Sequence, residues 1–533
     1  MLLADTFVDD KILDESDLSL LRAYTLKVED GLTDETFNKL RFAFPQASID
    51  TLKNTEKHIQ SLSGFQPVRY DCCPSSCICY TGPYETLLKC PKCDTDRYKA
   101  DGTTPQAYFQ YLPIIPHLRA MVSSSPYARK MQYRASHRPN PTKVTDVFDG
   151  AHYSLLWESF VTVGGEELPN WFFSDPRDIA LGLSSDGFGP FKHRTKTSWP
   201  IILFNYNLPP EERILKKNII SVGVIPGPKK PGDFDSFLWP LVQELLQLEL
   251  GVSAFDAITM TVFLLHAYLI VVFGDIPAVS KIMCMKGHNG FSPCHMCEIQ
   301  GIHIPSSQVK TLYVPLHREN FPDSPHQYDA TALPLRNHAS FMARAQEVQS
   351  ALTNATSEKL ATKYGIKGLP LLSALSSLSF PVSFPYDFMH LIWTNLIPNL
   401  ILLWTGNFKD LDHDDEGYVL APHVWQAIGE ATLNVGKTIP AAFGSRVPNI
   451  AAEKSQMTAE THSIWTMYLA PTLLNGRFIN EQYYKHFVQL VQLLSLCLEF
   501  EITQDQINDL ERGFQEWVEE YERYELLSLP DAI

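Results

Sequence analysis

No apolar run in this chain is long enough to cross a membrane. The longest, Ile258–Phe273, has 16 residues, whereas a spanning helix needs about 20. It contains His266 and two threonines, so we interpret it as a buried helix that runs into a buried strand. The N-terminus is acidic and lacks the basic segment and apolar core of a signal peptide. We therefore expect a soluble, intracellular protein with no membrane partner, whose ten cysteines are reduced thiols or metal ligands.

Positive charge is also scarce, with 44 Lys and Arg against 60 Asp and Glu and a formal net charge of -16. This balance argues against a protein that coats nucleic acid without specificity. The stretch His117–Lys143 is an exception, because it holds six basic residues and no acid. Tyr127 and Tyr133 interleave with these cations, which suits phosphate contacts combined with base stacking; a solvated linker is the alternative. The candidate DNA-binding residues are Arg119, Arg129, Lys130, Arg134, Arg138 and Lys143.

Cysteines are concentrated in one short region near the N-terminus. Cys73-x3-Cys77 and Cys90-x2-Cys93 are separated by twelve residues, and Pro and Gly lie at the turns. Two short thiol pairs at this spacing are typical of a structural zinc site, which takes four Cys or His ligands. Buried free thiols are the alternative. Neighbouring Cys72 and Cys79 could each replace one of the four ligands.

The centre of the chain alternates between strand and helix patterns. Three apolar stretches read as strands, "IALGLSSDGFGPF", "SWPIILFNYNLP" and "NIISVGVIPGP", and "DFDSFLWPLVQELLQLELG" reads as a helix. A fourth strand then ends at Asp275, as the first ends at Asp186. Three strands, a helix and a further strand is the order of an RNase H-like domain. The expected fold class is α/β: an RNase H-like catalytic core with a long insertion, an N-terminal zinc-knuckle module and helical N- and C-terminal regions.

Acidic residues at two strand ends suggest a second kind of metal site. Three convergent carboxylates can hold two Mg²⁺ ions for phosphodiester chemistry. Each acid also has a structural explanation, since Asp186-Gly187 could form a hairpin turn and Asp275 could end a strand in a turn. Carboxylates suit Mg²⁺ or Mn²⁺, whereas the thiols suit Zn²⁺.

Ordered motifs along the chain resemble one known family. They are "CCPSSCICYTGPY…CPKC", "KVTDVFDGAHY", "SSDGFGPF", "SWPIILFNYNLPP", "IPGPKKPGDFDSFLWPLVQEL", "FGDIPA", "KGHNGFSPCHMC", "YDFMHLIWTNLIPNL" and "RVPNIAAEKSQMTAETHSIWTMYLAP". Together they resemble the CACTA (En/Spm-type) DNA transposases, closest to the Plavaka-like group of fungal mobile elements. The resemblance implies a cut-and-paste DDE/D recombinase, related in its catalytic centre to the V(D)J recombinase.

The resemblance also implies site residues. It puts the first two catalytic acids at Asp186 and Asp275, with Mg²⁺ or Mn²⁺ as cofactor. For the third acid we predict Glu460, at the start of an apolar helix. Glu453 and Asp387 are the other candidates, and an ordinary first-turn glutamate favoured by the helix dipole is the alternative for Glu460.

A second structural zinc site is implied at Cys294 and Cys297, completed by His390. Two departures from the family pattern bear on these assignments. Asn395 stands where related recombinases offer a second histidine, and His462 stands where relatives often carry an aromatic residue. The fourth zinc ligand is therefore open among His288, His303 and His317.

The C-terminal stretch predicts an amphipathic helix that packs on the rest of the protein; packing on a partner helix is the alternative. Thr503 and Gln506 make a capping box, and the apolar face is Ile507, Leu510, Phe514, Trp517, Val518, Tyr521 and Tyr524. The predicted regions are 1–65 (helical), 66–105 (zinc knuckles), 106–150 (basic linker or DNA contact), 151–300 (first part of the core), 301–385 (insertion), 386–475 (completion of the core with the third acid) and 476–533 (C-terminal helices).

The resemblance implies a nuclear transposase that binds terminal inverted repeat DNA and target DNA as a homo-oligomer on DNA. It would cleave the element ends and join the freed 3′-hydroxyl to the target. One alternative is a decayed or domesticated relative that binds DNA without cutting it. Another is an unrelated zinc-stabilised nuclease of the same fold.

Overall fold

A computed structural model describes residues 14–63, 65–189, 197–303, 312–318, 327–408, 417–436 and 438–523. Tyr524 and the side chain of His303 lie outside this description. The chain divides into two compact units, and the predicted division into seven regions stays a prediction. Unit 1 comprises residues 1–137, 156–270 and 371–377, and unit 2 comprises residues 138–155, 271–370 and 378–533.

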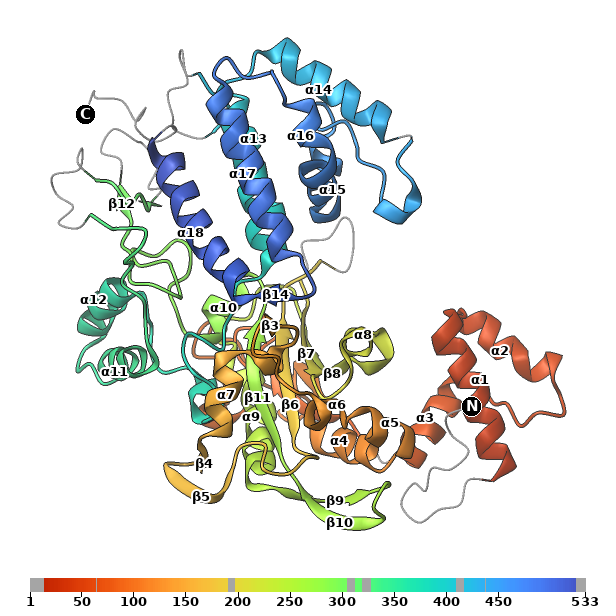
Figure 1. Ribbon diagram of the computed structural model, residues 1–533. Helices are drawn as coiled ribbons and strands as arrows, with labels where there is room; N and C mark the ends of the chain where they lie inside the picture. Colours follow the sequence, from red (N-terminus) through yellow and green to blue (C-terminus); the bar gives the residue numbers. More distant parts are fainter. Residues whose placement is uncertain are drawn as a thin grey trace. The chain divides into compact units, whose positions relative to one another are not determined.

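A six-stranded sheet is the centre of unit 1 (Figure 1). Its strand order is β1 (Val68–Cys72), β2 (Ala107–Tyr111), β8 (Ile220–Ile225), β7 (Trp199–Asn205), β6 (Ile179–Ser185) and β11 (Ala267–Phe273). The three consecutive strands β6, β7 and β8 pair antiparallel. β6 is buried almost throughout, while β7 alternates between buried and half-buried residues. These strands lie where the apolar runs predict them, so that part of the prediction is confirmed.

β11 extends the sheet beyond β6, although β6 comes much earlier in the sequence. The N–H of Ile179, the first residue of β6, donates to the carbonyl of His266, which precedes β11, at 2.9 Å. The two strands therefore begin together and run in the same direction. β11 continues from unit 1 into unit 2 at Val271.

One long helix and a hairpin separate β8 from β11. Helix α9 (Asp235–Leu250) ends at Gly251, which has a φ of 91°, a conformation that other residues rarely adopt. β9 (Val252–Asp256) and β10 (Thr261–Leu265) then form an antiparallel hairpin. The predicted helix in the first half of Ile258–Phe273 is therefore wrong, because its β-branched and aromatic residues pair across strands instead. Among the described residues, no helix is long and apolar enough to cross a membrane.

The N-terminal region and the basic stretch are both helical. The predicted helical N-terminus contains α1 (Glu15–Asp30), α2 (Asp34–Ala43) and α3 (Leu52–Ser63). The basic stretch folds into α4 (Ile114–Val122), α5 (Ser125–Lys130) and α6 (Tyr133–Ser136), so it is not an unstructured linker over these residues. The shorter elements of unit 1 are η1 (Gly82–Tyr84), β4 (Phe160–Val163), β5 (Glu166–Trp171), α8 (Pro210–Arg213), η3 (Lys216–Asn218) and η4 (Leu371–Ala374), and α7 (Ala151–Trp157) joins the two units in sequence.

Unit 2 is mainly helical. Its first elements are β3 (Lys143–Val144), η2 (Val147–Asp149), α10 (Ile276–Ile282), β12 (Ile302–His303), β13 (Leu312–Tyr313), α11 (His338–Gln349) and α12 (Asn354–Tyr364). A helical core follows, with the π-helix η5 (Met389–Leu396), α13 (Ile397–Trp404), α14 (Pro422–Val435), η6 (Ala441–Phe443), η7 (Lys454–Gln456), α15 (Ala459–Ile464), the π-helix η8 (Trp465–Leu469), α16 (Ala470–Leu473), α17 (Glu481–Cys497), β14 (Ile502–Thr503) and α18 (Gln504–Tyr521). Helices α11 and α12 lie in the predicted insertion, where no periodicity was evident in the sequence.

The C-terminal helix α18 packs against α17, as its apolar face predicts (Figure 1). The capping box of Thr503 and Gln506 is present at its start. Trp517 is buried, and its indole N–H donates to the carbonyl of His486 at 3.1 Å. The prediction that this helix packs within the protein is confirmed for the described residues.

Candidate functional site

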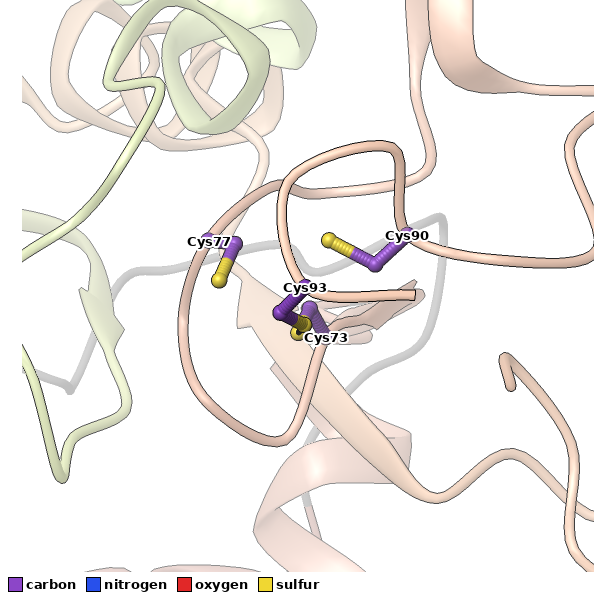
Figure 2. A group of neighbouring side chains, drawn as sticks. All are labelled: Cys73, Cys77, Cys90 and Cys93. Atoms are coloured by element: carbon purple, nitrogen blue, oxygen red, sulfur yellow. Dashed lines mark hydrogen bonds between the residues drawn. The ribbon is translucent and has the colours of Figure 1, made fainter. Parts of the chain in front are cut away.

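Four cysteine side chains meet at one point in unit 1 (Figure 2). The sulfur atoms of Cys73, Cys77, Cys90 and Cys93 all lie within 4.8 Å of one another. Four sulfurs arranged tetrahedrally around zinc at 2.3 Å would be about 3.8 Å apart. The group could therefore hold a zinc ion, and its members are the four residues predicted from the spacing. Cys72 and Cys79 are not part of it.

Two tight turns bring these thiols together. In the first turn, the N–H of Ser76 donates to the carbonyl of Cys73, and in the second the N–H of Asp94 donates to the carbonyl of Cys90. Ser76 and Asp94 both have a positive φ, at 58° and 55°, which allows each turn to close. Hydrogen bonding with Thr95 lowers the pKa of the Cys93 thiol to about 6, which favours the thiolate that a metal requires.

The second predicted thiol pair lies in unit 2 and is arranged as a single knuckle. The backbone N–H groups of Met296 and Cys297 donate to the sulfur of Cys294 at 3.3 and 3.2 Å. The hydroxyl of Tyr386 lies 3.1 Å from the same sulfur. Hydrogen bonding with Cys297 is the main cause that lowers the pKa of Cys294 to about 5, while the pKa of Cys297 is raised.

His390 does not join this pair in the structure. Its Nδ1 lies 2.9 Å from Oδ2 of Asp387, and within the described ranges His390 forms no three-ligand group with Cys294 and Cys297. Tyr386 was not predicted as a neighbour of the thiols. Its signal in the sequence is its place at the start of "YDFMH", the motif that supplies His390.

Asp186 directly follows β6 but does not form the hairpin turn between β6 and β7. The two strands continue to pair beyond it, because Phe188 and Ser198 exchange backbone hydrogen bonds of 3.0 and 2.9 Å. The N–H of Gly187 donates to Oδ1 of Asp186 at 2.6 Å. A Cβ on Gly187 would lie 2.6 Å from the indole of Trp199, so only glycine fits beside this acid without a shift.

Asp275 comes two residues after β11 and caps helix α10. Its Oδ1 accepts the N–H of Ala278 at 2.6 Å. This cap fixes the direction of the carboxylate relative to the helix. The cap uses one of the two carboxylate oxygens, and the side chain is half-buried rather than enclosed.

The three candidates for the third acid lie in unit 2, each with a defined partner. The carboxylate of Glu460, in the first turn of α15, accepts the N–H and the hydroxyl of Ser445 at 2.9 and 2.8 Å. The backbone hydrogen bond from Ser445 is the main cause that lowers the pKa of Glu460. Glu453 accepts the N–H of Asn449 at 2.9 Å, and Asp387 pairs with His390 as described above. Ser445 was not singled out from the sequence, and no motif there indicates it.

The six predicted DNA-binding residues are not equivalent. Arg134 is only 3% exposed, and its guanidinium donates to the carbonyls of Asp178 and Asp175 at 2.9 and 2.8 Å. Lys130 and Lys143 are exposed and form ion pairs with Glu212 and Glu501. The exposed members are Arg119, Arg129, Lys130, Arg138 and Lys143.

Comparison with known families gives one match. Residues 157–347 match the family model described as Transposase family tnp2. The matched range contains Asp186, Asp275 and the thiol pair of unit 2, and it ends before His390 and Glu460. No curated protein gives a significant match to the chain. The family match supports a transposase function, which implies DNA binding.

Proposed function

We propose that this chain is a cut-and-paste DNA transposase of the CACTA type, near the Plavaka-like group, that uses DDE/D chemistry. The observation that carries the proposal is the family match over residues 157–347, which spans both Asp186 and Asp275. The enzyme would act in the nucleus on the terminal inverted repeats of its element. It would cleave a phosphodiester at each element end and join the freed 3′-hydroxyl to target DNA.

The sheet supports an RNase H-like core for this chemistry. The strand order β8, β7, β6, β11 places the fourth core strand beside the first, which is the order expected of that fold. Because β6 and β11 begin together, they also end at the same edge. Asp186 directly follows β6, and Asp275 comes two residues after β11.

The residues fit divalent hard cations, since each offers carboxylate oxygens and both aspartates are partly exposed. Asp186, Asp275 and Glu460 would hold Mg²⁺ or Mn²⁺. When bound, such ions activate the attacking oxygen and stabilise the leaving oxygen of a phosphodiester. The protein contributes orientation: the α10 cap holds Asp275, and Ser445 holds Glu460. Hydrogen bonds from Ser445 lower the pKa of Glu460, so they favour the carboxylate form that a metal would bind.

The two thiol sites would be structural. Zinc at Cys73, Cys77, Cys90 and Cys93 would close the two knuckle turns that follow β1. We propose a second zinc at Cys294 and Cys297 with His390, which would need the His390 side chain to turn from Asp387. DNA would contact the exposed cations Arg119, Arg129, Lys130, Arg138 and Lys143, and we leave Arg134 out of this set because it is buried. A homo-oligomer would hold two element ends together.

A cleavage assay tests the proposed function. The substrate is a duplex carrying the terminal inverted repeat that flanks the gene, incubated with the full chain and Mg²⁺ or Mn²⁺. We expect nicks with a 3′-hydroxyl and joined products with a target plasmid, both lost in Asp186→Asn and Asp275→Asn. Asp30→Asn, at an exposed aspartate of helix α1, is the matched control and should retain cleavage.

The outcomes separate the proposed enzyme from its alternatives. Retained DNA binding without cleavage in the wild-type chain would favour a decayed or domesticated transposase. Cleavage without joined products would favour a nuclease. Cleavage that persists in both aspartate variants would contradict the assignment of these acids.

A further inference from the structure

The connection between β7 and β8 exposes two neighbouring aliphatic side chains. Ile214 follows helix α8 and is 71% exposed, and Leu215 is 42% exposed. Lys216 and Lys217 come next in the chain, and both are exposed. Transfer of an aliphatic side chain out of water is favourable, and a lysine side chain attracts negative charge. A partner that covers this segment should therefore offer apolar surface flanked by anions.

Buried polar side chains anchor this segment on both sides of the aliphatic pair. Arg213, directly before the pair, is buried, and its Nε donates to two backbone carbonyls that follow β7, at 3.2 and 2.8 Å. Asn218, directly after the two lysines, is 3% exposed and donates to the carbonyl of Glu212 at 2.8 Å. The exposure of the aliphatic pair is therefore set by the fold and not by a loose loop.

The same segment packs against helix α5 of the basic stretch. The hydroxyl of Tyr127 donates to Oδ1 of Asn218 at 3.0 Å. Nζ of Lys130 lies 2.7 Å from a carboxylate oxygen of Glu212, and this ion pair neutralises one of the two acids of the segment. These contacts lie on either side of the aliphatic pair and the two lysines. In a chain with a net charge of -16, the pair thus lies on a local cationic surface.

We propose that Ile214 inserts between two base pairs of bound DNA and bends the duplex, while Lys216 and Lys217 contact the flanking phosphates. Duplex DNA meets both conditions stated above, because its stacked apolar bases are flanked by phosphates. Proteins that bind the minor groove insert aliphatic side chains in this way and bend DNA by about 20–90°. Duplex DNA as the ligand rests on the proposed function, whereas its distortion by Ile214 goes beyond it.

Insertion also predicts which DNA is bound best. Contacts to phosphates carry no sequence information, whereas the cost of unstacking depends on the base step and is lowest where a base is mismatched. We therefore expect a single mismatch at the inserted step to lower the Kd by at least about threefold. A mismatch at other positions should leave the Kd unchanged.

Binding of the full chain to a duplex that carries the terminal inverted repeat, with a dye at each end, tests the proposal. We expect energy transfer between the dyes to rise on binding, because a bend brings the ends together. Ile214→Ala should abolish this rise and the preference for the mismatch. It should leave the salt dependence of binding and the melting temperature unchanged, since Ile214 is exposed and uncharged. Leu352→Ala is the matched control, because Leu352 is 100% exposed and lies outside the segment.

The two lysines give a second readout. Lys216→Ala combined with Lys217→Ala should lower the slope of log binding constant against log salt concentration by about two, whereas Lys53→Ala, at an exposed lysine of helix α3, should leave it unchanged. A wild-type chain that binds the duplex without bending it would overturn the proposal, as would a bend that Ile214→Ala retains. Either result would leave the proposed function standing, since neither concerns cleavage. A chain that binds no duplex would contradict both.

Discussion

At the scale of single residues, burial separates basic side chains that the sequence cannot tell apart. Arg129 and Arg134 occupy one short cationic stretch, yet Arg129 is exposed while Arg134 is buried over the ring of Phe173 and bound to two carbonyls. The sequence shows the density of charge, whereas the role of each charge depends on which helix face meets the sheet. The stretch was therefore predictable as basic, but its structural arginine was not.

This difference in burial predicts that alanine at Arg134 lowers stability, whereas alanine at Arg129 affects DNA binding. Arg134→Ala should lower the free energy of unfolding by about 2–4 kcal/mol, because two carbonyls lose a charged donor. Arg129→Ala should leave the free energy of unfolding unchanged. It should reduce the slope of log binding constant against log salt concentration by about one, the value for one lost phosphate contact. Chemical denaturation and DNA binding at several salt concentrations measure both. Equal stability of the two variants would contradict the structural role of Arg134.

The buried carboxyl group of Glu249 should make the free energy of unfolding depend on pH. It is 1% exposed, its Oε2 has no hydrogen-bond partner among the residues that the structure describes, and the hydroxyl of Ser377 lies 3.3 Å from Oε1. Burial raises its pKa from 4.5 to about 8. Between these two values the unfolded chain loses a proton that the folded chain keeps, so this group's contribution to stability falls as pH rises and levels off above about 8.

Glu249→Gln should remove this dependence. The variant should be more stable than the wild-type chain at pH 8.5, with a smaller difference near pH 5, and the change across the window should be on the order of a few kcal/mol. Urea denaturation of both proteins at these two pH values measures it. A difference that does not change with pH would show that Glu249 titrates normally.

At the scale of elements, local sequence patterns predicted individual strands and helix caps well, but they did not predict the pairing of β9 with β10. The strand before Asp186 and the capping box at Thr503 follow from local sequence patterns and are present. The β9–β10 hairpin was missed because "ITMTVFLLHAYLIVVF" contains no Gly or Asn turn signal. Its turn is instead closed by the side chain of Asp256, a contact that hydrophobic periodicity does not show.

Removal of one thiol from the zinc knuckles should change both zinc content and stability. Cys90→Ser should remove one zinc per chain and destabilise the protein, because a closed zinc site contributes folding free energy directly. Metal analysis of purified protein and thermal melting measure the two effects. Cys72→Ser, outside the four-thiol group, is the matched control and should keep the wild-type zinc content.

The second thiol pair requires its own test. If Cys294 and Cys297 hold zinc, Cys294→Ser should lower the zinc content by one further ion, and the double variant with Cys90→Ser should lose two. Unchanged zinc content in Cys294→Ser would leave the pair as a hydrogen-bonded knuckle beside Tyr386. His390→Ala would then be expected to have no effect on metal content.

At the scale of the whole molecule, one sheet neighbour agrees with the strand order of an RNase H-like domain. The chain visits β6, β7, β8, α9 and then β11, and β11 lies beside β6 as that order predicts. The third acid could not be fixed in this way. Glu460, Glu453 and Asp387 lie in unit 2, each begins or precedes a helical segment, and each has its own hydrogen-bond partner.

The central claim is that Asp186 and Asp275 bind the same metal ion. Titration of the full chain with Mn²⁺, followed by electron paramagnetic resonance, tests it without knowledge of the DNA sequence. We predict that Asp186→Asn and Asp275→Asn each weaken Mn²⁺ binding. The double variant should lose no more than one bound Mn²⁺ ion per chain. The Asp30→Asn control, at an exposed aspartate, should bind as the wild-type chain does. Mn²⁺ binding that is unchanged in both single variants, or two independent losses that add in the double variant, would contradict the claim.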